Sequence, residues 1–316
     1  MHLLIPVFFN SPSGGLHENV LQTANYLKSK GNQVTVICKP GVFSQTLEGL
    51  GIDRIESNFA TSSFLSILDI VSDLHKKSPI SLIHSHPFAS RKVAIIISQN
   101  LGIPLVITVH GRYLDDVTSQ PQFYDKIITV SHGIGNYLIA NGLQEPEKLF
   151  TSPNTPDSFF LEKSSDKFEG SPRRDSITIA LATRLDADKQ FILDIFSKAI
   201  SSASQDIDQK INWLVIGDGE KKSCFQKLVD SIKGKNSVSF MGWLEGRSLK
   251  DAYTKADIIV APGRCALEAM ACGVVTIGLG SKGYIGIIGP QNWELGIYSN
   301  FGGLGAMHDS YQEGSI

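Results

Sequence analysis

The stretch SLIHSHPFASRKVAIIISQNLGIPLVITVH (81–110) carries the pattern on which the fold prediction depends. Its two ends, SLIHSH and PLVITVH, are short apolar runs of the length typical of buried strands. Between them, a helical pattern over about 88–101 ends before Gly102 and Pro104, a glycine that can cap a helix and a proline that cannot continue one. Strand, helix and strand in this order predict a βαβ unit of a parallel sheet.

The same alternation extends in both directions along the chain. A polar segment with three prolines, 152–176, interrupts it once. We therefore predict an α/β protein of two Rossmann-like, doubly wound domains, 1–160 and 176–316, joined by a linker at 161–175. Strands are expected at 3–9, 33–38, 81–86, 104–110 and 126–131 in the first half, and at 176–182, 212–217, 237–242, 257–261 and 274–278 in the second.

Composition excludes several functional classes. The 316 residues carry 29 Lys and Arg against 31 Asp and Glu, and no basic run of five residues, so no nucleic acid partner is expected. Four cysteines without CxxC spacing do not form a disulfide framework. The apolar start MHLLIPVFF (1–9) lacks a positively charged region before it, which argues against a signal peptide. We expect a cytoplasmic protein.

Glycines and histidines stand at the expected ends of strands. Gly14 and Gly15 follow the first strand, where a backbone can approach a ligand closely and a helix N-terminus follows. His84 and His86 lie two residues apart on one strand face, but no third ligand follows at metal spacing, so no metal is expected. The GxGxxG pattern at 278–283 is not followed by a helical pattern, which argues against a dinucleotide site.

The helix expected at 264–272 begins after a Pro-Gly turn. The amides of Arg264, Cys265 and Ala266 would lie at its N-terminus, which favours phosphate binding.

Several motifs in order resemble one enzyme family, the GT-B nucleotide-sugar glycosyltransferases of group 1, family 4, whose members retain the donor's anomeric configuration. The resemblance extends from Gly14 to about Gly303. It rests on SGGLHENVLQTANYLKSKGNQVTVI (13–37), LIHSHP (82–87), VITVHG (106–111), DKIITVS (125–131), TRLDADK (183–189), WLVIGDGE (213–220), VSFMGWL (238–244) and ALEAMACG (266–273).

The resemblance implies a GT-B fold, two domains facing each other across a cleft, and a set of donor-binding residues. Arg184 and Lys189 match the cations that grip the donor diphosphate, where they would stabilise the charge that develops on the leaving group. Glu268 matches the glutamate that accepts hydrogen bonds from the ribose. Main-chain groups near Gly242 would read the base, and Gly15 would lie near the diphosphate.

The resemblance also implies residues near the reacting centre and the acceptor. His110 matches a histidine close to the reacting centre, where it could orient the acceptor, donate to the sugar or carry a proton. Gly14, His86 and Arg112 are the acceptor-side candidates. Members of this family are typically metal-independent, so neither a metal nor another cofactor is expected.

Two features depart from the family pattern. Position 260 is Val where a second glutamate normally begins a loop that contacts the donor sugar, and the loop is shortened to Ala261-Pro262-Gly263-Arg264. Arg264 and backbone groups would have to replace that contact. The chain also stops at Ile316, where family members usually continue with further helices, so activity is less certain to be retained.

The sequence thus predicts a retaining glycosyltransferase that moves a sugar from a nucleotide diphosphate to a glycan or lipid-linked acceptor in cell-envelope or polysaccharide biosynthesis. At most weak peripheral membrane association is expected. The alternatives are a sugar-nucleotide epimerase on the same fold and a degenerate protein that binds a sugar nucleotide without turnover.

Overall fold

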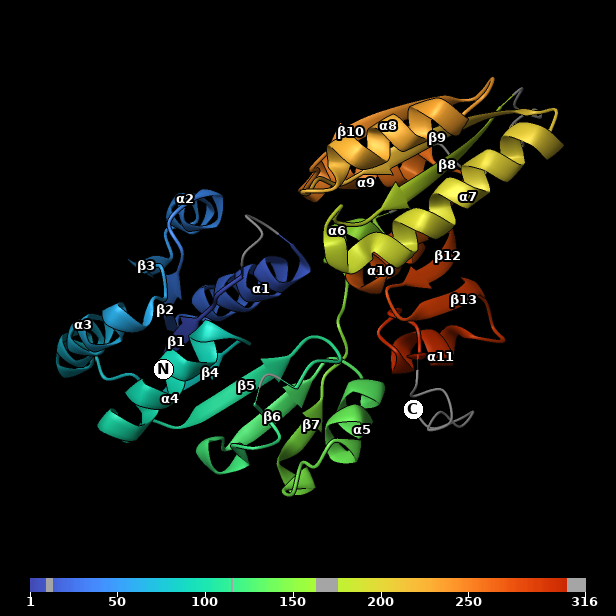
Figure 1. The fold of residues 1–316 in the computed structure, drawn as a ribbon. Coiled ribbons are helices and arrows are strands. Elements are labelled where there is room, and N and C mark those ends of the chain that lie inside the picture. The colour runs from blue at the N-terminus through green and yellow to red at the C-terminus, as the bar shows by residue number, and fades with distance from the viewer. Residues whose placement is uncertain (10–13, 115, 163–175, 306–316) are drawn as a thin grey trace. The chain divides into compact units, whose positions relative to one another are not determined.

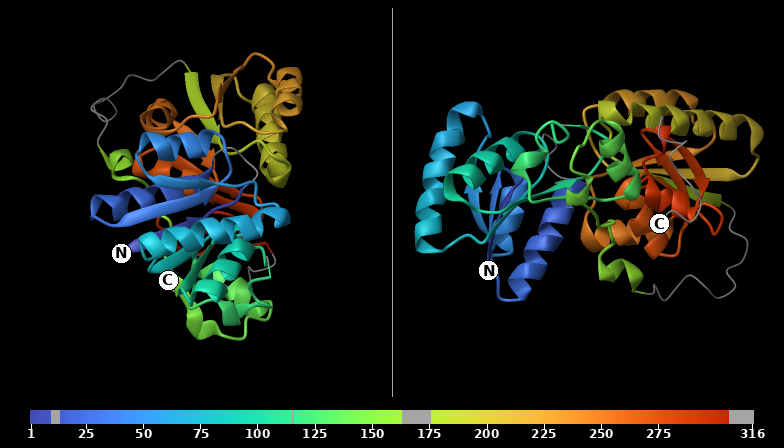
Figure 2. Two further views of the ribbon diagram at one scale, coloured as in Figure 1. Left: turned by 90° about the vertical axis from the view of Figure 1, so that its left-hand side faces the viewer. Right: turned by 90° about the horizontal axis from the view of Figure 1, so that it is seen from below.

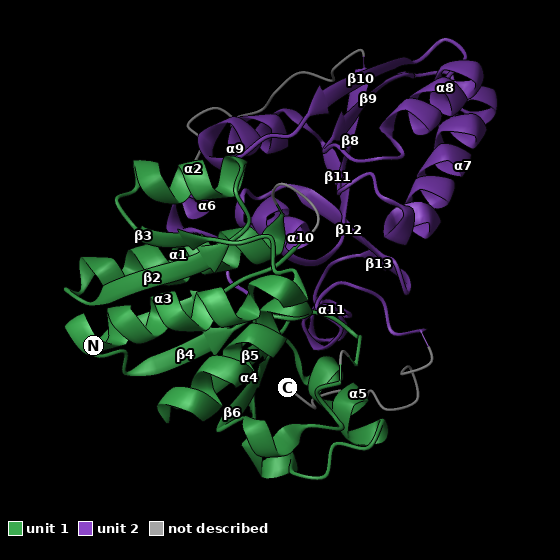
Figure 3. Cartoon of the chain, turned by 60° about the vertical axis from the view of Figure 1, so that its left-hand side comes forward, with its two compact units in different colours: residues 1–153 green, residues 154–316 purple. Residues whose placement is uncertain are grey.

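The computed structural model describes residues 1–9, 14–114, 116–162 and 176–305. The chain forms two compact units, 1–153 and 154–316 (Figure 3). Residues 154–162 thus belong to the second unit, whereas the sequence pattern placed the first domain's end at 160. Most of the expected linker, 163–175, lies outside the described residues, so that linker stays a prediction.

Unit 1 is built on a seven-stranded parallel sheet of order β3-β2-β1-β4-β5-β6-β7 (Figure 1). Its strands are β1 (His2–Pro6), β2 (Gln33–Cys38), β3 (Asp53–Glu56), β4 (Leu82–Ser85), β5 (Leu105–Val109), β6 (Lys126–Thr129) and β7 (Leu149–Thr151). Its helices are α1 (Gly15–Ser29), α2 (Val42–Gly49), α3 (Phe64–Lys77), α4 (Ala89–Leu101) and α5 (His132–Ala140).

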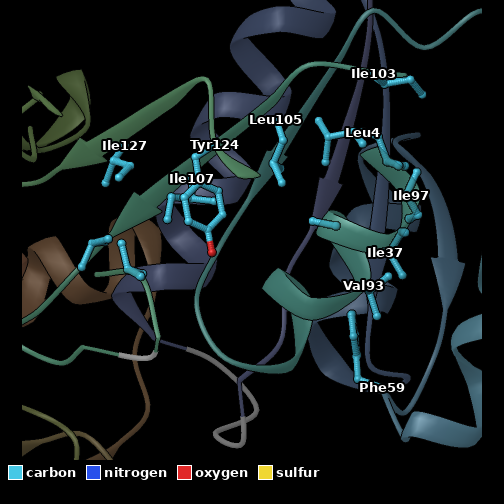
Figure 4. Close-up of a cluster of buried hydrophobic side chains, with 14 of the residues drawn as sticks. Leu4, Ile37, Phe59, Val93, Ile97, Ile103, Leu105, Ile107, Tyr124 and Ile127 are labelled. Carbon is cyan, nitrogen blue, oxygen red and sulfur yellow. The ribbon is translucent and has the colours of Figure 1, made fainter. Parts of the chain in front are cut away.

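Both faces of this sheet are buried. Along β1, Leu3 and Ile5 pack with α1 and α2, whereas Leu4 between them packs in a cluster with α3, α4 and α5. Part of this second cluster, including Phe59 and Tyr124, is drawn in Figure 4. Alternate side chains of a strand point to opposite faces, so a strand covered on both sides reads as a continuous apolar run.

Unit 2 contains a six-stranded sheet of order β10-β9-β8-β11-β12-β13, in which only β13 runs antiparallel to its neighbour. Its strands are β8 (Ser176–Ala182), β9 (Lys210–Ile216), β10 (Ser237–Gly242), β11 (Ile258–Ala261), β12 (Val275–Gly280) and β13 (Gly283–Ile287). Its helices are α6 (Ser158–Leu161), α7 (Gln190–Asp206), α8 (Lys222–Ile232), α9 (Gly246–Lys255), α10 (Gly263–Ala271) and α11 (Trp293–Tyr298).

The second sheet is also covered on both faces, as Figures 1 and 2 show. Leu181 on β8 packs with α7 and α8, while its neighbours Ala180 and Ala182 pack with α6, α9 and α10. The predicted doubly wound α/β architecture is therefore confirmed for each unit. No helix in the described part of the chain is long and apolar enough to cross a membrane.

The sequence pattern missed three strands, all of them at sheet edges. β3 and β7 have four and three residues and are mostly half-buried or exposed, so they lack the apolar run of a central strand. β13, in YIGIIGP, contains the glycines that argued against a helix at this point. The prediction that no helix follows 278–283 is confirmed, because β12 turns there into the antiparallel β13.

Candidate functional site

Most predicted site residues lie directly after parallel strands, at their carboxyl ends. The chain order of the sheet reverses between β1 and β4 in unit 1 and between β8 and β11 in unit 2. Ligands of open α/β sheets bind outside such reversal points. Gly15 follows β1, His86 follows β4, Arg184 follows β8 and Arg264 follows β11. Each unit therefore places its candidates where its own sheet favours binding.

The structure brings three histidines of unit 1 together. β4 and β5 are neighbours in parallel register, so His86 and His110 end adjacent strands. Nδ1 of His86 lies 2.8 Å from Nε2 of His110, and the ring centroids are 5.1 Å apart with an angle of 24° between the ring planes. The ring centroid of His84 lies 4.9 Å from that of His86. Nε2 of His84 forms a hydrogen bond with Oγ1 of Thr108 at 2.7 Å. This group is called the histidine cluster below.

Burial keeps the histidine cluster uncharged. It lowers the pKa of His84 to about 4 and that of His110 to about 3. The pKa of His86 is also well below its ordinary value, first through burial and then through repulsion from the other histidines, including His17. Near neutral pH, the cluster therefore contains neutral imidazole rings, each with one donor and one acceptor nitrogen.

The other candidates of unit 1 follow β1 or β5 along the chain. Gly14 precedes α1, and its carbonyl accepts the amide of Glu18 at 3.1 Å. Gly15 is the first residue of α1, so its amide belongs to the first turn, whose N–H groups have no partner within a helix. Arg112 stands two residues after His110 and is half-buried. The roles of Gly14 and Arg112 toward an acceptor, and of Gly15 near the diphosphate, stay predictions.

In unit 2, Arg184 and Lys189 converge on one carboxylate oxygen. Oδ2 of Asp188 lies 3.0 Å from Nη2 of Arg184 and 2.8 Å from Nζ of Lys189. Arg184 also pairs with Asp186, and Lys189 Nζ donates to Ser281 Oγ at 3.2 Å. The two cations thus both contact a single oxygen atom, which is the arrangement needed to hold an oxygen of a diphosphate.

Two glycines after β9 shape the loop that carries Arg184. Gly217 and Gly219 have φ of 135° and 157°, and a Cβ on either would overlap the carbonyl of Thr183 or of Leu185. These glycines are needed because two backbones meet there, not because the loop must be flexible. The amide of Leu185 donates to the carbonyl of Asp218 at 2.9 Å, which further fixes the loop.

α10 carries a buried ion pair. Nε of Arg264 bonds to Oε1 of Glu268 at 2.7 Å, and both side chains are 7% exposed. Nη2 of Arg264 also lies 3.4 Å from Oδ2 of Asp157, which precedes α6. Burial raises the pKa of Glu268, and the charge of Arg264 opposes that rise. Two residues that the sequence assigned to the donor therefore bind each other, and a third residue, Asp157, joins them.

The N-terminus of α10 differs in one detail from the expectation. The amide of Ala266 donates to the carbonyl of Pro262 at 3.4 Å, so it is already bonded inside the helix and was wrongly counted as an anion donor. An α-helix leaves only its first amides without partners, because each later N–H bonds to the carbonyl four residues before it. Burial raises the pKa of the Cys265 thiol to about 12, which keeps that side chain protonated.

Gly242 ends β10 and joins it to the turn after β9. Its carbonyl accepts the amide of Gly217 at 2.8 Å, and its φ of 70° favours glycine. That carbonyl therefore already has one partner. The contact of main-chain groups near Gly242 with the nucleotide base stays a prediction.

Sequence reasoning missed three residues that complete these sites. Asp188 lies inside the quoted TRLDADK motif, and the spacing of four to Arg184 is the available signal for its contact. Ser281 lies in the turn after β12, and Asp157 lies 107 positions before Arg264, so no local pattern connects either one to its partner. Among the described residues, no group of three or more His, Cys, Asp or Glu could hold a metal ion.

Comparison with known proteins identifies the family. Residues 13–157 match the model of Glycosyltransferase Family 4, and residues 162–296 match the model of Glycosyl transferases group 1. The chain belongs to the group 1 glycosyltransferases. This group 1 glycosyltransferase also shares the GT-B fold, since it matches the Anabaena Alr3699/HepE structure in complex with UDP-glucose with a TM-score of 0.69, at 19% identity over 87% of this chain and 79% of that one.

Two curated relatives match most of this glycosyltransferase at low identity. The Phosphatidylinositol N-acetylglucosaminyltransferase GPI3 subunit of Saccharomyces cerevisiae (strain YJM789) is 23% identical over 304 residues, which are 85% of this chain and 66% of that protein. The Uncharacterized glycosyltransferase YqgM of Bacillus subtilis (strain 168) is 23% identical over 305 residues, 89% of this chain and 79% of that protein. The predicted family is confirmed, whereas substrates and stereochemistry stay open to proposal.

Proposed function

We propose that this protein transfers a sugar from a nucleoside diphosphate sugar to a glycan or lipid-linked acceptor with retention of configuration. The convergence of Arg184 and Lys189 on one oxygen carries the proposal. In glycosyl transfer, the sugar becomes cation-like while negative charge grows on the leaving diphosphate. Cations fixed at that oxygen stabilise the transition state more than the ground state.

Asp188 supports this assignment because it supplies the kind of oxygen that the donor would bring. Its side chain is 53% exposed, compared with 19% for Arg184 and 20% for Lys189, so a ligand can displace it more easily than the cations. A diphosphate oxygen in the same place would keep both charge-assisted hydrogen bonds and add a second negative charge. Ser281 would offer its hydroxyl beside Lys189.

Glu268 and Gly242 would hold the nucleoside. Arg264 occupies Oε1 of Glu268, so the ribose hydroxyls would share the carboxylate with Arg264. Main-chain groups near Gly242 would contact the base. We propose uridine diphosphate sugars as the first donors to test, because a structural neighbour is named as a complex with UDP-glucose and a relative as an N-acetylglucosaminyltransferase.

Retention would follow from a same-face displacement in which an oxygen of the leaving phosphate takes the acceptor's proton. No metal or cofactor enters this scheme. We further propose that the enzyme acts in the cytoplasm in cell-envelope or polysaccharide biosynthesis, with at most weak peripheral membrane association.

The proposal is tested by substituting the converging cations. In Lys189→Ala and Arg184→Ala, transfer from the best donor should fall by about 10²–10³-fold, the usual cost of losing one charge-stabilising group from an active site. Lys198→Ala is the matched control, because Lys198 lies exposed on α7. Transfer should be followed with a panel of nucleotide sugars, and the anomeric configuration of the product by NMR.

The outcomes separate the proposal from its alternatives. Unchanged transfer in both cation variants would overturn the assignment of Arg184 and Lys189. Conversion of the donor to its epimer without an acceptor would show a sugar-nucleotide epimerase instead. Donor binding that is lost in Lys189→Ala but kept in Lys198→Ala, with no product from any donor, would show a sugar-nucleotide-binding protein without turnover.

A further inference from the structure

The histidine cluster contains a side chain that cannot act as the acceptor contact expected from the sequence. His86 is 1% exposed, and its backbone is fixed at both ends. Its amide donates to the carbonyl of Pro6 at 3.2 Å, and its carbonyl accepts Ser90 Oγ at 2.9 Å. Its ring bonds through Nδ1 to Nε2 of His110. His86 is thus a rigid, buried support behind a more exposed histidine.

A hydrogen bond between two ring nitrogens constrains the protons of both rings. At 2.8 Å, one nitrogen must donate and the other must accept, so a single proton lies between Nδ1 of His86 and Nε2 of His110. Both rings are neutral near pH 7, because burial and the neighbouring His84 disfavour the charged form of each. Each neutral ring has one N–H, so the tautomer of His86 decides the tautomer of His110.

The other nitrogen of His110 is available for a ligand. Among the described residues, Nδ1 of His110 makes no hydrogen bond, and the side chain is only half-buried. The backbone amide of His110 donates to Oη of Tyr113 at 3.0 Å, which fixes the residue from the other side. The direction of the bond to His86 therefore determines whether His110 presents an N–H donor or a lone pair at Nδ1.

We propose that Nδ1–H of His86 donates to Nε2 of His110 and thereby fixes His110 as the neutral Nδ1–H tautomer, a hydrogen-bond donor to an oxygen of the bound substrate. This inference rests on the proposed function, since it assigns the role of His110 in glycosyl transfer. His86 is then a residue that positions His110 and does not contact the acceptor substrate. His110 acts as a hydrogen-bond donor and not as a general base.

The chemistry of the proposed ligands favours this direction. A nucleotide sugar and its acceptor present many oxygens that accept hydrogen bonds, and in the proposed mechanism the leaving phosphate already takes the acceptor's proton. A neutral imidazole N–H can donate a hydrogen bond to an oxygen that carries negative charge, and a low pKa for protonation keeps the ring in this neutral form. The reverse direction would make His110 a second base in a reaction whose proposed mechanism already has one.

The tautomer can be measured without substrate. In the 316-residue chain labelled with ¹⁵N, long-range proton–nitrogen correlation spectra distinguish protonated from unprotonated ring nitrogens. We expect His110 to show Nδ1 protonated and Nε2 unprotonated. In His86→Leu, His110 should change to the Nε2–H form that free neutral histidine favours. His86→Asn, whose amide N–H can donate from nearly the place of Nδ1, should restore the Nδ1–H form.

Kinetics test the consequence for transfer. His86→Leu should lower kcat by about 10²-fold with little change in the affinity for UDP. The reason is that the hydrogen bond donated by His110 would be lost mainly in the transition state. His86→Asn should recover most of that loss. His2→Leu is the control for general destabilisation, since His2 is also buried and bonds to Thr35 Oγ1 at 2.9 Å, but at the other end of β1.

The two proposals fail in different ways. An Nε2–H tautomer of His110 in the wild-type protein, or an unchanged tautomer in His86→Leu, would overturn the role of His86 whether or not the protein transfers sugar. Equal kcat in His86→Leu and wild type would also overturn it. The absence of transfer in the wild-type protein would count against the proposed function, while the spectra would still decide the direction of the hydrogen bond.

Discussion

At the scale of single residues, Asp188 marks the proposed donor site because it contacts both cations. Burial alone would raise the pKa of Asp188, but Lys189 and Arg184 outweigh it and hold that pKa below the ordinary value. Asp188 is therefore charged at neutral pH. Its carboxylate neutralises the two side chains that would bind the diphosphate, so it competes with the ligand for them.

Asp188→Asn should therefore strengthen the binding of UDP. A partly exposed ion pair contributes up to about 1 kcal/mol, so removing the competing charge should lower Kd roughly fivefold. Isothermal titration calorimetry measures this change. Asp194→Asn is the control, because Asp194 is exposed on α7 and bonds to Gln190 at 2.8 Å. Weaker binding in Asp188→Asn than in Asp194→Asn would mean that Asp188 orients the cations instead.

The residues of these sites differ in how well the sequence predicts them. Arg184 and Lys189 belong to one short loop, so spacing and motif could identify the pair. The link between His86 and His110 follows only from the pairing of β4 with β5, which the sequence does not specify. The pairing of Arg264 with Glu268 is local, but Asp157 reaches Arg264 only through the folded unit. Local contacts were thus predictable, and contacts between distant segments were not.

At the scale of elements, the turn between β12 and β13 depends on close backbone packing. A Cβ on Gly280 would overlap the backbone of Gly302, and the amide of Lys282 donates to the carbonyl of Gly302 at 2.9 Å. The same turn carries Ser281, which contacts Lys189. Gly280 is therefore needed for packing that supports the turn with Ser281.

Gly280→Ala should destabilise unit 2 by about 1–3 kcal/mol, the usual cost of overfilling a packed region. It should also weaken UDP binding, because the turn with Ser281 must shift. Urea unfolding measures the first effect and calorimetry the second. Gly49→Ala is the control, since a Cβ there meets open space at the end of α2. Equal stability of Gly280→Ala and wild type would show that the turn is not tightly packed.

The histidines at the ends of β4 and β5 should make the free energy of unfolding depend on pH. The pKa values of His84, His86 and His110 are lowered in the folded state, so the unfolded state binds protons first as the pH falls below about 6.5. Stability is complete above that pH and decreases below it, by up to about 1.4 kcal/mol per pH unit for each ring. His84→Val should reduce this slope, whereas replacement of the exposed His132 by Gln should not. Identical slopes in urea unfolding between about pH 7.5 and pH 5 would contradict the burial of a neutral ring at 84.

At the scale of the whole molecule, the central strands and helices were predictable and the unit boundary was not. Central strands of a parallel sheet are apolar on both faces, so their runs stand out in the sequence. The segment 154–162 has no such pattern, yet Phe160 is 2% exposed and packs with Tyr253 and Phe301 of unit 2. A short apolar pair in a polar, proline-rich segment gives no local sign of which core it joins.

The stability of unit 2 should therefore depend on a segment that the sequence assigned to the first domain and the start of the linker. Nζ of Lys250 donates to the carbonyls of Phe159 and Glu162 at 2.6 and 2.8 Å, and Asp157 contacts Arg264. A fragment of residues 154–316 should have a free energy of unfolding about 3–5 kcal/mol above that of 163–316, since a buried phenylalanine alone contributes that much. Phe160→Ala in the full chain should lower stability similarly if neither fragment folds. Equal stability of the two fragments in urea, or a Phe160→Ala variant as stable as wild type, would place the start of unit 2 after residue 162.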